Sequence, residues 1–528
     1  MHLLIPGRHH LLTEFQFKYL FRILNSPSDT TDIKGEKFPE STKIESIIFA
    51  VTSANHAGTK RNPLPFHLRA MMIQSFSAGL DIPCYVFGID DAGQLEDFAD
   101  YTVKTIGHAS NHEFNLSPEN TSVICSTPVL EMYQKKGYRI LPAELEDHDA
   151  QTYHTTLPWE FVERICSSEN WMNDAGIVDG IHFSSLKLWN TYNLDKKVRS
   201  ILQDPIIGDD GDITESRDYN TYVRQMDDIA ELKFNDTLPF IKSGNIGDIG
   251  CAVGSWIKLA CDNGNFIESD FYGIEVARQL FDICQQRKHN GEFKSPAVFF
   301  AMKNAVTSLV FEKESMNTIH TSSLTHEIES YGSHQDLLDF IKNRYYELKP
   351  GGVWINRDVI GPEEGEKTIY MSLNTSDGEN ENPLATCADT DELKNHLEGL
   401  STYSRFIRFS DDFRKSEGYQ LEYTLSDHQD RKVVALKYKD AADFILTKDY
   451  TDNWQSEMHE TFCFWSFSDW KNALESVGFK LKGESKAYQN PWILENRWIG
   501  KVELFQDENL TSKQDFPPTN MLMIAEKL

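Results

Sequence analysis

The chain has 528 residues, 40% of them hydrophobic, and a formal net charge of −29 at pH 7. Because a single hydrophobic core rarely grows beyond about 250–300 residues, this length predicts two to four domains. The negative charge repels polyanions, so extended contact with DNA or RNA is not expected, although a local basic patch could still hold a phosphate or an RNA end.

The eight cysteines contain no CxxC pair, which predicts reduced thiols, a cytoplasmic setting and no structural zinc or other metal centre. No secretory signal is apparent, and no run of 18 apolar residues predicts a membrane span. We expect a small-molecule substrate. The oligomeric state is left open, a homo-oligomer included.

Residues 1–170 alternate short apolar segments with helical patterns, which predicts an α/β domain with a parallel sheet. The predicted strands lie in HLLIPG, IESIIFAVTSA, IPCYVFGID and SVICST. Residues 171–225 are polar and predict a connector, which holds the acidic loop GDDGD at 208–212. The helical pattern YVRQMDDIAELKF then leads into the next domain.

Two motifs follow the first two predicted strands: IPGRHHLLTEFQ, and then NPLPFHLR. Their order resembles the nucleotidylyltransferase superfamily, particularly its nicotinamide-nucleotide adenylyltransferase branch, over about residues 1–170. The resemblance implies a doubly wound HUP (Rossmann-like) fold and the use of ATP or CTP with Mg²⁺. It also implies a set of nucleotide-binding residues: Gly7, Arg8, Thr13, Gln16, Asn62, Arg69 and Thr156.

The match to that superfamily is incomplete. Gln16 stands where its signature ends in histidine, and no arginine follows Thr156 at the expected spacing, although Arg164 could substitute. His9 and His10 are therefore our catalytic candidates, because a nearby cation could stabilise charge on a transferring phosphate. Two other interpretations stay open: a domain that only binds a nucleotide or substrate, and a plain solvated loop.

From residue 226 a second alternating series predicts another parallel sheet, with strands in IGDIGCAV, FYGIEV, NTIHTSS and GGVWINRDVI. Residues 362–460 interrupt it with an acidic, Asn- and Asp-rich stretch. That stretch also contains strand-like YQLEYTL and KVVALKY, which predicts a small ordered lid. The helix WSFSDWKNALESVGF and the strand NMLMIAE complete the domain, which we place at 226–528.

Candidate ligand-binding residues follow the first strands of this series. Asp248, Gly250, Ala252 and Gly254 form a strand-to-helix loop, where a residue without Cβ lets a ligand approach the free N–H groups of the helix. An ordinary tight turn would look the same. Glu275 ends the next strand, where a carboxylate could accept both ribose hydroxyl protons.

Two further features extend this pattern. Asn304 follows another strand, where it could read an adenine edge, and LKPGGVWIN places Pro350, Gly351 and Gly352 before the fourth strand. Together these motifs resemble class I S-adenosylmethionine-dependent methyltransferases over about residues 226–528, with the insertion unmatched. The resemblance implies S-adenosylmethionine as cofactor, bound by the loop, Glu275 and Asn304. A Rossmann dehydrogenase fits less well, because the third glycine of its fingerprint is missing.

The segment HTSSLTHEIESYG follows the strand that faces the methyl group in that family. His326, Glu327 and Tyr331 could therefore deprotonate or orient an acceptor. The alternative is a plain helix start, capped by Ser322 or Thr325.

The function that fits both halves best is a bifunctional enzyme, with methyl transfer in the carboxy-terminal half. Its amino-terminal half would transfer a nucleotidyl group to a small molecule that bears a phosphate or phosphonate. The alternatives are a methyltransferase whose amino-terminal domain only binds a nucleotide or substrate, and a methyltransferase that modifies RNA ends.

Overall fold

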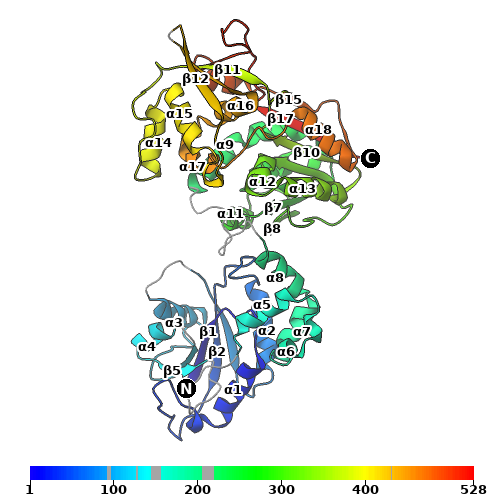
Figure 1. Cartoon of the computed structure of the whole chain (residues 1–528). Helices are drawn as coiled ribbons and strands as arrows, with labels where there is room; N and C mark the ends of the chain where they lie inside the picture. Colours follow the sequence, from blue (N-terminus) through cyan, green and yellow to red (C-terminus); the bar gives the residue numbers. More distant parts are fainter. Residues whose placement is uncertain (92–96, 126–128, 144–155, 205–218, 430) are drawn as a thin grey trace. The chain divides into compact units, whose positions relative to one another are not determined.

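The computed structural model describes residues 1–91, 97–125, 129–143, 156–204, 219–429 and 431–528, with only the backbone at 219–226 and 228. The predicted acidic loop at 208–212 lies outside these residues. The chain forms two compact units, Met1–Gly211 and Asp212–Leu528, the first blue to cyan and the second green to red in Figure 1. Each unit is described by itself.

The first unit is built on a five-stranded sheet in the order β3-β2-β1-β4-β5, and every pair of neighbours is parallel. The strands are β1 (His2–Gly7), β2 (Ser46–Thr52), β3 (Cys84–Ile89), β4 (Thr121–Cys125) and β5 (Arg139–Pro142). The order reverses between β1 and β4, so a topological switch point lies where these two strands end.

Helices cover both faces of this sheet, as the predicted alternation requires (Figure 1). The helices on one face are α1 (Glu14–Asn25), α2 (Phe66–Ser77), α5 (Pro158–Ser167), α6 (Ala175–Val178), α7 (Phe183–Thr191) and α8 (Leu194–Leu202); those on the other are α3 (Phe98–Ala109) and α4 (Leu130–Lys135).

The boundary expected at residue 170 is wrong. Trp171, Trp189 and Val198, in the predicted connector, are buried in the same core as Leu3 of β1. The reason is hydrophobic: the helices α6, α7 and α8 look polar by composition, but each buries an apolar stripe on the sheet.

The second unit has a larger sheet in the order β14-β17-β10-β9-β6-β7-β8, and β15 also pairs with β17. The strands are β6 (Asn245–Ile249), β7 (Asp270–Glu275), β8 (Val298–Met302), β9 (Met316–Ser322), β10 (Leu348–Asp358), β14 (Phe479–Leu481), β15 (Lys486–Tyr488) and β17 (Asn520–Lys527). The strands from β10 to β8 are parallel, and β17 is antiparallel to β10. The order reverses between β6 and β9, which makes this the switch point of the second sheet.

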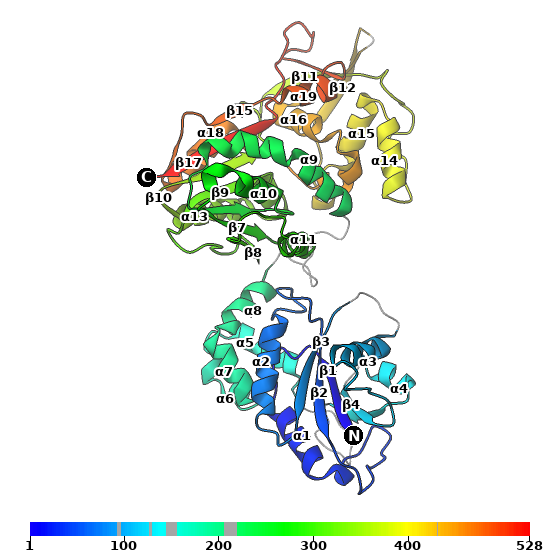
Figure 2. The ribbon, with the colours of Figure 1, turned by 180° about the vertical axis from the view of Figure 1, so that it is seen from behind.

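Helices again cover both faces. In Figure 1, α12 (Thr325–Tyr331) and α13 (His334–Glu347) lie in front of the sheet; α18 (Phe467–Val477) adds to the core on their face. In Figure 2, seen from behind, α9 (Tyr219–Thr237) and α10 (Ser255–Asp262) are in front, with α11 (Arg278–His289) beside them. The lead-in helix predicted from YVRQMDDIAELKF is α9.

The predicted lid is an ordered subdomain with its own antiparallel sheet, β12-β13-β11-β16, which we call the cap. Its strands are β11 (Thr368–Leu373), β12 (Tyr423–His428), β13 (Arg431–Lys437) and β16 (Val502–Phe505); its helices are α14 (Thr390–Gly399), α15 (Thr402–Asp412), α16 (Tyr438–Thr447), α17 (Trp454–Glu457) and α19 (Pro491–Ile493).

The cap is larger than the predicted insertion at 362–460. The chain leaves it for α18, β14 and β15 and then returns, so that β16 pairs with β11 and Trp498 joins the cap core. One continuous insertion could not account for a strand that arrives after three elements outside the cap.

The segment Pro350-Gly351-Gly352 lies inside β10 instead of in a turn before it. The pairing of β10 with β9 shifts register between Leu348 and Val353, so the segment forms a bulge. Gly351 has φ +76°, which favours glycine.

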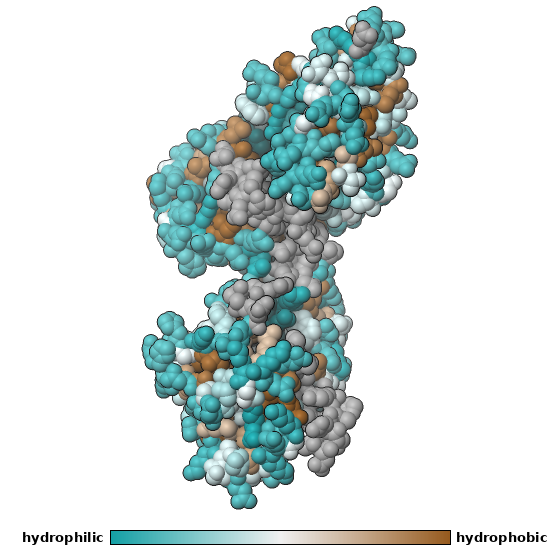
Figure 3. Space-filling model, turned by 90° about the vertical axis from the view of Figure 1, so that its left-hand side faces the viewer, coloured by the Kyte–Doolittle hydropathy of each residue, from teal (hydrophilic) through white to brown (hydrophobic). Residues whose placement is uncertain are grey.

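The surface in Figure 3 is mostly hydrophilic, with hydrophobic residues scattered over it, as the net charge of −29 leads one to expect. Among the described residues, no helix combines the length and the apolar character needed to cross a membrane.

Candidate functional site

The loop from Gly250 to Gly254 runs from the end of β6 to the start of α10, at the switch point of the second sheet. Gly250, Ala252 and Gly254 have φ values of +69°, +48° and +77°, so every second residue of the loop is left-handed. A Cβ added to Gly250 would lie 3.1 Å from the side chain of Leu324, just before α12. The loop therefore presses against the turn that follows β9.

Glu275, the last residue of β7, holds this loop in place. One carboxylate oxygen accepts the N–H of Ala252 at 2.9 Å, and the other accepts those of Val276 and Ala277 at 2.8 and 2.9 Å. Burial raises the pKa of Glu275 to about 7, although these hydrogen bonds act to lower it. An ionised carboxylate has about four lone-pair sites, so one or more remains for a hydroxyl donor.

Asp248 and His320 are paired across the neighbouring strands β6 and β9. Their side chains are buried, and Nδ1 of His320 lies 2.7 Å from an oxygen of Asp248. The imidazole stacks on the indole of Trp256, with ring centroids 4.1 Å apart. Nε2 of His320 and the hydroxyl of Ser322 are buried without a hydrogen-bond partner, and they lie two residues apart on one strand, which places them on one face of the sheet.

Asn304 and Lys233 lie near the same strand ends. Asn304 is buried just after β8 and accepts the N–H of Val306 at 2.8 Å. Lys233, on α9, is half-buried; burial and the Arg357 guanidinium lower its pKa to about 8, while Asp358 and Asp248 oppose the shift. The sequence prediction missed Lys233, because only the fold brings α9 over the strand ends.

His326 begins the first turn of α12 and is buried against a carboxylate from β10. Its Nδ1 lies 2.6 Å from Asp358, whose second oxygen accepts the N–H of Thr325 at 2.7 Å. The helix is thus capped by Asp358, and not by Ser322 or Thr325 as the alternative interpretation expected. Asp358, 32 residues from His326 in sequence, was not among the predicted site residues.

The other side of His326 faces the cap. Its Nε2 lies 3.3 Å from an oxygen of the buried Glu460, which also accepts the Tyr331 hydroxyl at 3.1 Å. Burial alone would lower the pKa of His326, but Asp358 and Glu460 raise it well above its usual value. Although burial alone would raise it, the imidazolium and the hydrogen bonds lower the pKa of Asp358 to about 2.

These contacts change the roles that the sequence suggested. An imidazolium between two carboxylates has no free site for a proton, so His326 is not arranged as a general base. Burial also raises the pKa of Tyr331, which keeps its phenol protonated as a donor to Glu460. Glu327 is half-buried and is the predicted residue of this segment whose carboxylate remains a base candidate.

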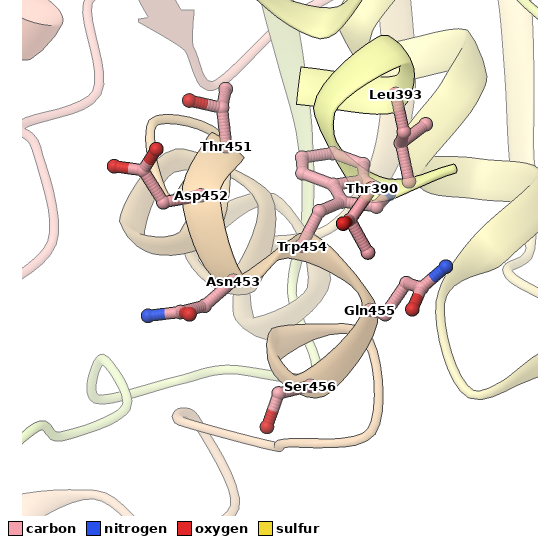
Figure 4. A pocket seen from close by; sticks show the side chains of 8 residues that line it. All are labelled: Thr390, Leu393, Thr451, Asp452, Asn453, Trp454, Gln455 and Ser456. Atoms are coloured by element: carbon pink, nitrogen blue, oxygen red, sulfur yellow. The ribbon is translucent and has the colours of Figure 1, made fainter. Parts of the chain in front are cut away.

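A pocket in the cap lies between α14 and the segment Thr451–Ser456 (Figure 4). Thr390 and Leu393 line one side of it, and Asp452, Trp454 and Ser456 are among the residues on the other. Its enclosed space holds about one water molecule, which is too small for a substrate.

In the first unit, the predicted residues His9 and His10 lie just after β1, at the switch point. His9 is left-handed with φ +53°, and burial lowers its pKa to about 4. His10 is buried with both ring nitrogens unpartnered; burial, and then the charges of Arg69 and Arg8, lower its pKa well below the usual value. Both rings are therefore neutral at pH 7, whereas the predicted role in stabilising phosphate charge needs a cation.

The other predicted nucleotide-binding residues divide into two groups. Thr13 and Gln16 form a reciprocal capping box at the start of α1, with hydrogen bonds of 3.1 and 3.0 Å. Arg69 is fully buried and donates to the backbone carbonyls of Arg8, Thr52 and Ser53, so it joins the ends of β1 and β2. In the structure, the side chains of Thr13, Gln16 and Arg69 therefore stabilise the fold.

The second group lies closer to His10 or to the surface. The buried amide oxygen of Asn62 has no partner, and Asn62 lies beside His10. Arg8 is exposed, and the ring of His9 packs on Gly7. Thr156 is half-buried two residues before α5, where Arg164 lies 3.9 Å from Glu160. Nucleotide binding by these residues stays a prediction.

No protein-family model and no curated protein matches the chain. The solved structures that it resembles include S-adenosylmethionine-dependent methyltransferases. One from Listeria monocytogenes, described as putative, is 13% identical with a TM-score of 0.28 and covers 57% of this chain and 99% of its own. One from Mesorhizobium loti is 13% identical with a TM-score of 0.32 and covers 56% of this chain and 98% of its own. One from Archaeoglobus fulgidus is 11% identical with a TM-score of 0.31 and covers 59% of this chain and 100% of its own.

Proposed function

We propose that the second unit is a methyltransferase that uses S-adenosylmethionine. The observation that carries this proposal is the hydrogen-bonded pair of the left-handed loop at Gly250–Gly254 and the buried Glu275, at a topological switch point. Ligands of open α/β sheets bind at such points, outside the carboxyl ends of the strands.

The residues at these strand ends fit that cofactor. Glu275 keeps lone pairs for the ribose hydroxyls, and Asn304 ends the neighbouring strand, where an adenine edge would lie. The unpartnered Nε2 of His320 and hydroxyl of Ser322 supply buried polar groups for the amino-acid end of the cofactor. Gly250 lacks a Cβ, which lets the backbone of the loop lie close to Leu324.

Bound S-adenosylmethionine would supply a methyl group on a positively charged sulfur. The protein then has to align an acceptor with that methyl group and exclude water. The cap segment around Glu460 packs on α12, which begins directly after β9, so the acceptor would be enclosed by cap and sheet. Glu327, at the start of α12, is the residue we propose to accept a proton from an acceptor hydroxyl.

Calorimetry with S-adenosylhomocysteine tests this assignment. We expect one site per chain, which Gly250→Arg and Glu275→Ala remove, because the arginine would fill the loop and the alanine would leave it unanchored. Gly264→Arg is the matched control, since Gly264 lies in the same unit with open space around its Cα. Normal binding by Gly250→Arg and Glu275→Ala would show that the site is misplaced.

For the first unit we propose a nucleotide site, and nucleotidylyl transfer to a phosphate- or phosphonate-bearing small molecule as its activity. The supporting observation is His10, buried with both nitrogens unpartnered at the switch point and beside Asn62 and Arg8. Among the described residues of this unit, no three His, Cys, Asp or Glu side chains converge on one point. The Mg²⁺ would therefore arrive with ATP or CTP, as it commonly does.

Pyrophosphate release from ATP and CTP, in the presence of candidate phosphate acceptors, tests the activity. His10→Ala should remove it, because a neutral imidazole can still donate a hydrogen bond to a phosphate oxygen, and His108→Ala, on α3, should leave it unchanged. Nucleotide binding without pyrophosphate release would instead support a domain that only binds a nucleotide or substrate.

A further inference from the structure

Three side chains with metal-binding atoms converge between α12 and the cap. One ligand atom each of His326, Glu327 and Glu460 lies within 4.8 Å of the other two. His326 and Glu460 are buried, and Glu327 is half-buried. His326 and Glu327 come from the start of α12, whereas Glu460 comes from the cap, more than 130 residues later.

A further residue orients each of two of these side chains, His326 and Glu460, by a hydrogen bond. Nδ1 of His326 is bound to Asp358 at 2.6 Å, which directs Nε2 toward Glu460. One oxygen of Glu460 accepts the Tyr331 hydroxyl at 3.1 Å, which leaves the other for His326. Carboxylate–histidine pairs of this kind orient the ligands of metal ions in proteins.

The separation between His326 and Glu460 is compatible with two ligands of one ion. Charged N–H···O bonds are about 2.7–2.9 Å long, as the contact with Asp358 nearly is. The Nε2–Glu460 distance is 3.3 Å. Two ligands about 2.0–2.2 Å from one ion lie roughly 2.8–3.1 Å apart at octahedral angles and roughly 3.3–3.6 Å apart at tetrahedral angles. The distance between Nε2 and Glu460 therefore matches that between two ligands of a common ion.

The cluster carries more acidic than basic side chains. Asp358, Glu460 and Glu327 bring three carboxylates to one imidazole, and Asp358 and Glu460 are almost fully buried. Buried carboxylates without sufficient positive charge are costly. Lys233 on α9 lies close enough to interact electrostatically with Asp358 and Glu327, but it is also near Arg357 and Asp248.

We propose that His326, Glu327 and Glu460 bind a divalent cation, which replaces the proton on Nε2 of His326. One imidazole and two carboxylates suit a first-row ion such as Mn²⁺ or Zn²⁺ better than Ca²⁺, which prefers oxygen ligands alone. Three protein ligands leave open positions for a substrate. The ion would join the cap to α12, beside the proposed cofactor site.

The cation also defines the acceptor, a step that rests on the methyl transfer proposed above. A hydroxyl group bound to the ion would have a lowered pKa and would lose its proton to the second carboxylate oxygen of Glu327 or to water. Its oxygen would then attack the methyl carbon while the carbon–sulfur bond breaks and its electron pair stays on sulfur. The acceptor class is therefore a hydroxylated small molecule, with two adjacent oxygens favoured for chelation.

Titration of the full-length protein tests the site. After treatment with a chelator and desalting, MnCl₂ and ZnCl₂ are titrated by calorimetry, and bound Mn²⁺ is counted by loss of the free-ion electron paramagnetic resonance signal. We expect one ion per chain. Glu327→Gln and Glu460→Gln should weaken binding at least tenfold, and Tyr331→Phe about tenfold. Glu329→Gln should bind like wild type, because Glu329 pairs with His334.

Failure of the wild type to bind either ion would overturn the proposal, as would equal affinity in the Glu327→Gln, Glu460→Gln and Glu329→Gln variants. If Glu460→Gln does not fold, the half-buried Glu327 still decides the question. S-adenosylhomocysteine is titrated into the same metal-free samples. Metal binding without S-adenosylhomocysteine binding would reject the methyltransferase. Binding of S-adenosylhomocysteine without metal binding would reject only the cation site.

Discussion

Glu275 is a single carboxylate on which both the loop and the proposed cofactor site depend. Its three backbone hydrogen bonds act to stabilise the charged form, but burial dominates and the pKa rises to about 7. The free protein therefore holds a mixture of protonated and ionised Glu275 near neutral pH. Ribose hydroxyls donate hydrogen bonds, so they favour the ionised form and would lower this pKa.

S-adenosylhomocysteine should accordingly bind more tightly as the pH rises. A group with a pKa of about 7 in the free protein and a lower one in the complex releases a proton on binding. Between pH 8 and pH 6 the affinity should fall about tenfold, as calorimetry in buffers of different ionisation enthalpy would measure together with the proton released.

Glu275→Gln is the control, because it cannot titrate. Its affinity should be lower at pH 8, since the amide cannot accept all the backbone N–H groups that the carboxylate accepts. It should no longer vary between pH 6 and pH 8. A variant with the full wild-type pH dependence would place the titrating group elsewhere.

At the scale of elements, the loop between β6 and α10 carries a conformational cost that glycine would avoid. Ala252 has φ +48°, in the region where a residue with a Cβ costs about 1–2 kcal/mol. The alanine methyl group packs beside Val253 and Ala277, which recovers part of the cost.

Ala252→Gly should therefore stabilise the protein by about 0.5–1 kcal/mol, since relief of the left-handed strain exceeds the entropy cost of glycine. The same substitution at Ala260, buried in the middle of α10, should destabilise it by about 1 kcal/mol or more. Urea unfolding of both variants measures these two changes in the free energy of unfolding, which should have opposite signs. Equal destabilisation by both would contradict the strain that we assign to Ala252.

The same elements show which parts of the site the sequence could reveal. Gly250 and Glu275 follow short apolar runs directly, and His326 lies in the segment after a predicted strand, so their places at strand ends or a helix start could be predicted. Asp358, Glu460 and Lys233 could not, because β10, the cap and α9 meet only in three dimensions. Thr13 and Gln16 show a role that the motif did not reveal: in the structure they form a helix cap.

At the scale of the whole molecule, the alternation of strands and helices predicted two α/β units with parallel sheets, and both are present. The boundaries were harder. The helices α6 to α8 looked like a polar connector because half of each faces water, and β16 could not be assigned to the cap from its position after β15. Long-range pairing and one-sided burial leave weak signals in composition.

Because each unit has cores of its own, the full-length protein should unfold in two calorimetric transitions. S-adenosylhomocysteine at about 100 times its dissociation constant adds roughly 2.7 kcal/mol to the unit that binds it, a shift of about 5 °C or more in one transition. ATP or CTP with Mg²⁺ should shift only the other. Glu275→Ala should remove the first effect and His10→Ala the second. Movement of both transitions by one ligand would contradict separate sites in the two units.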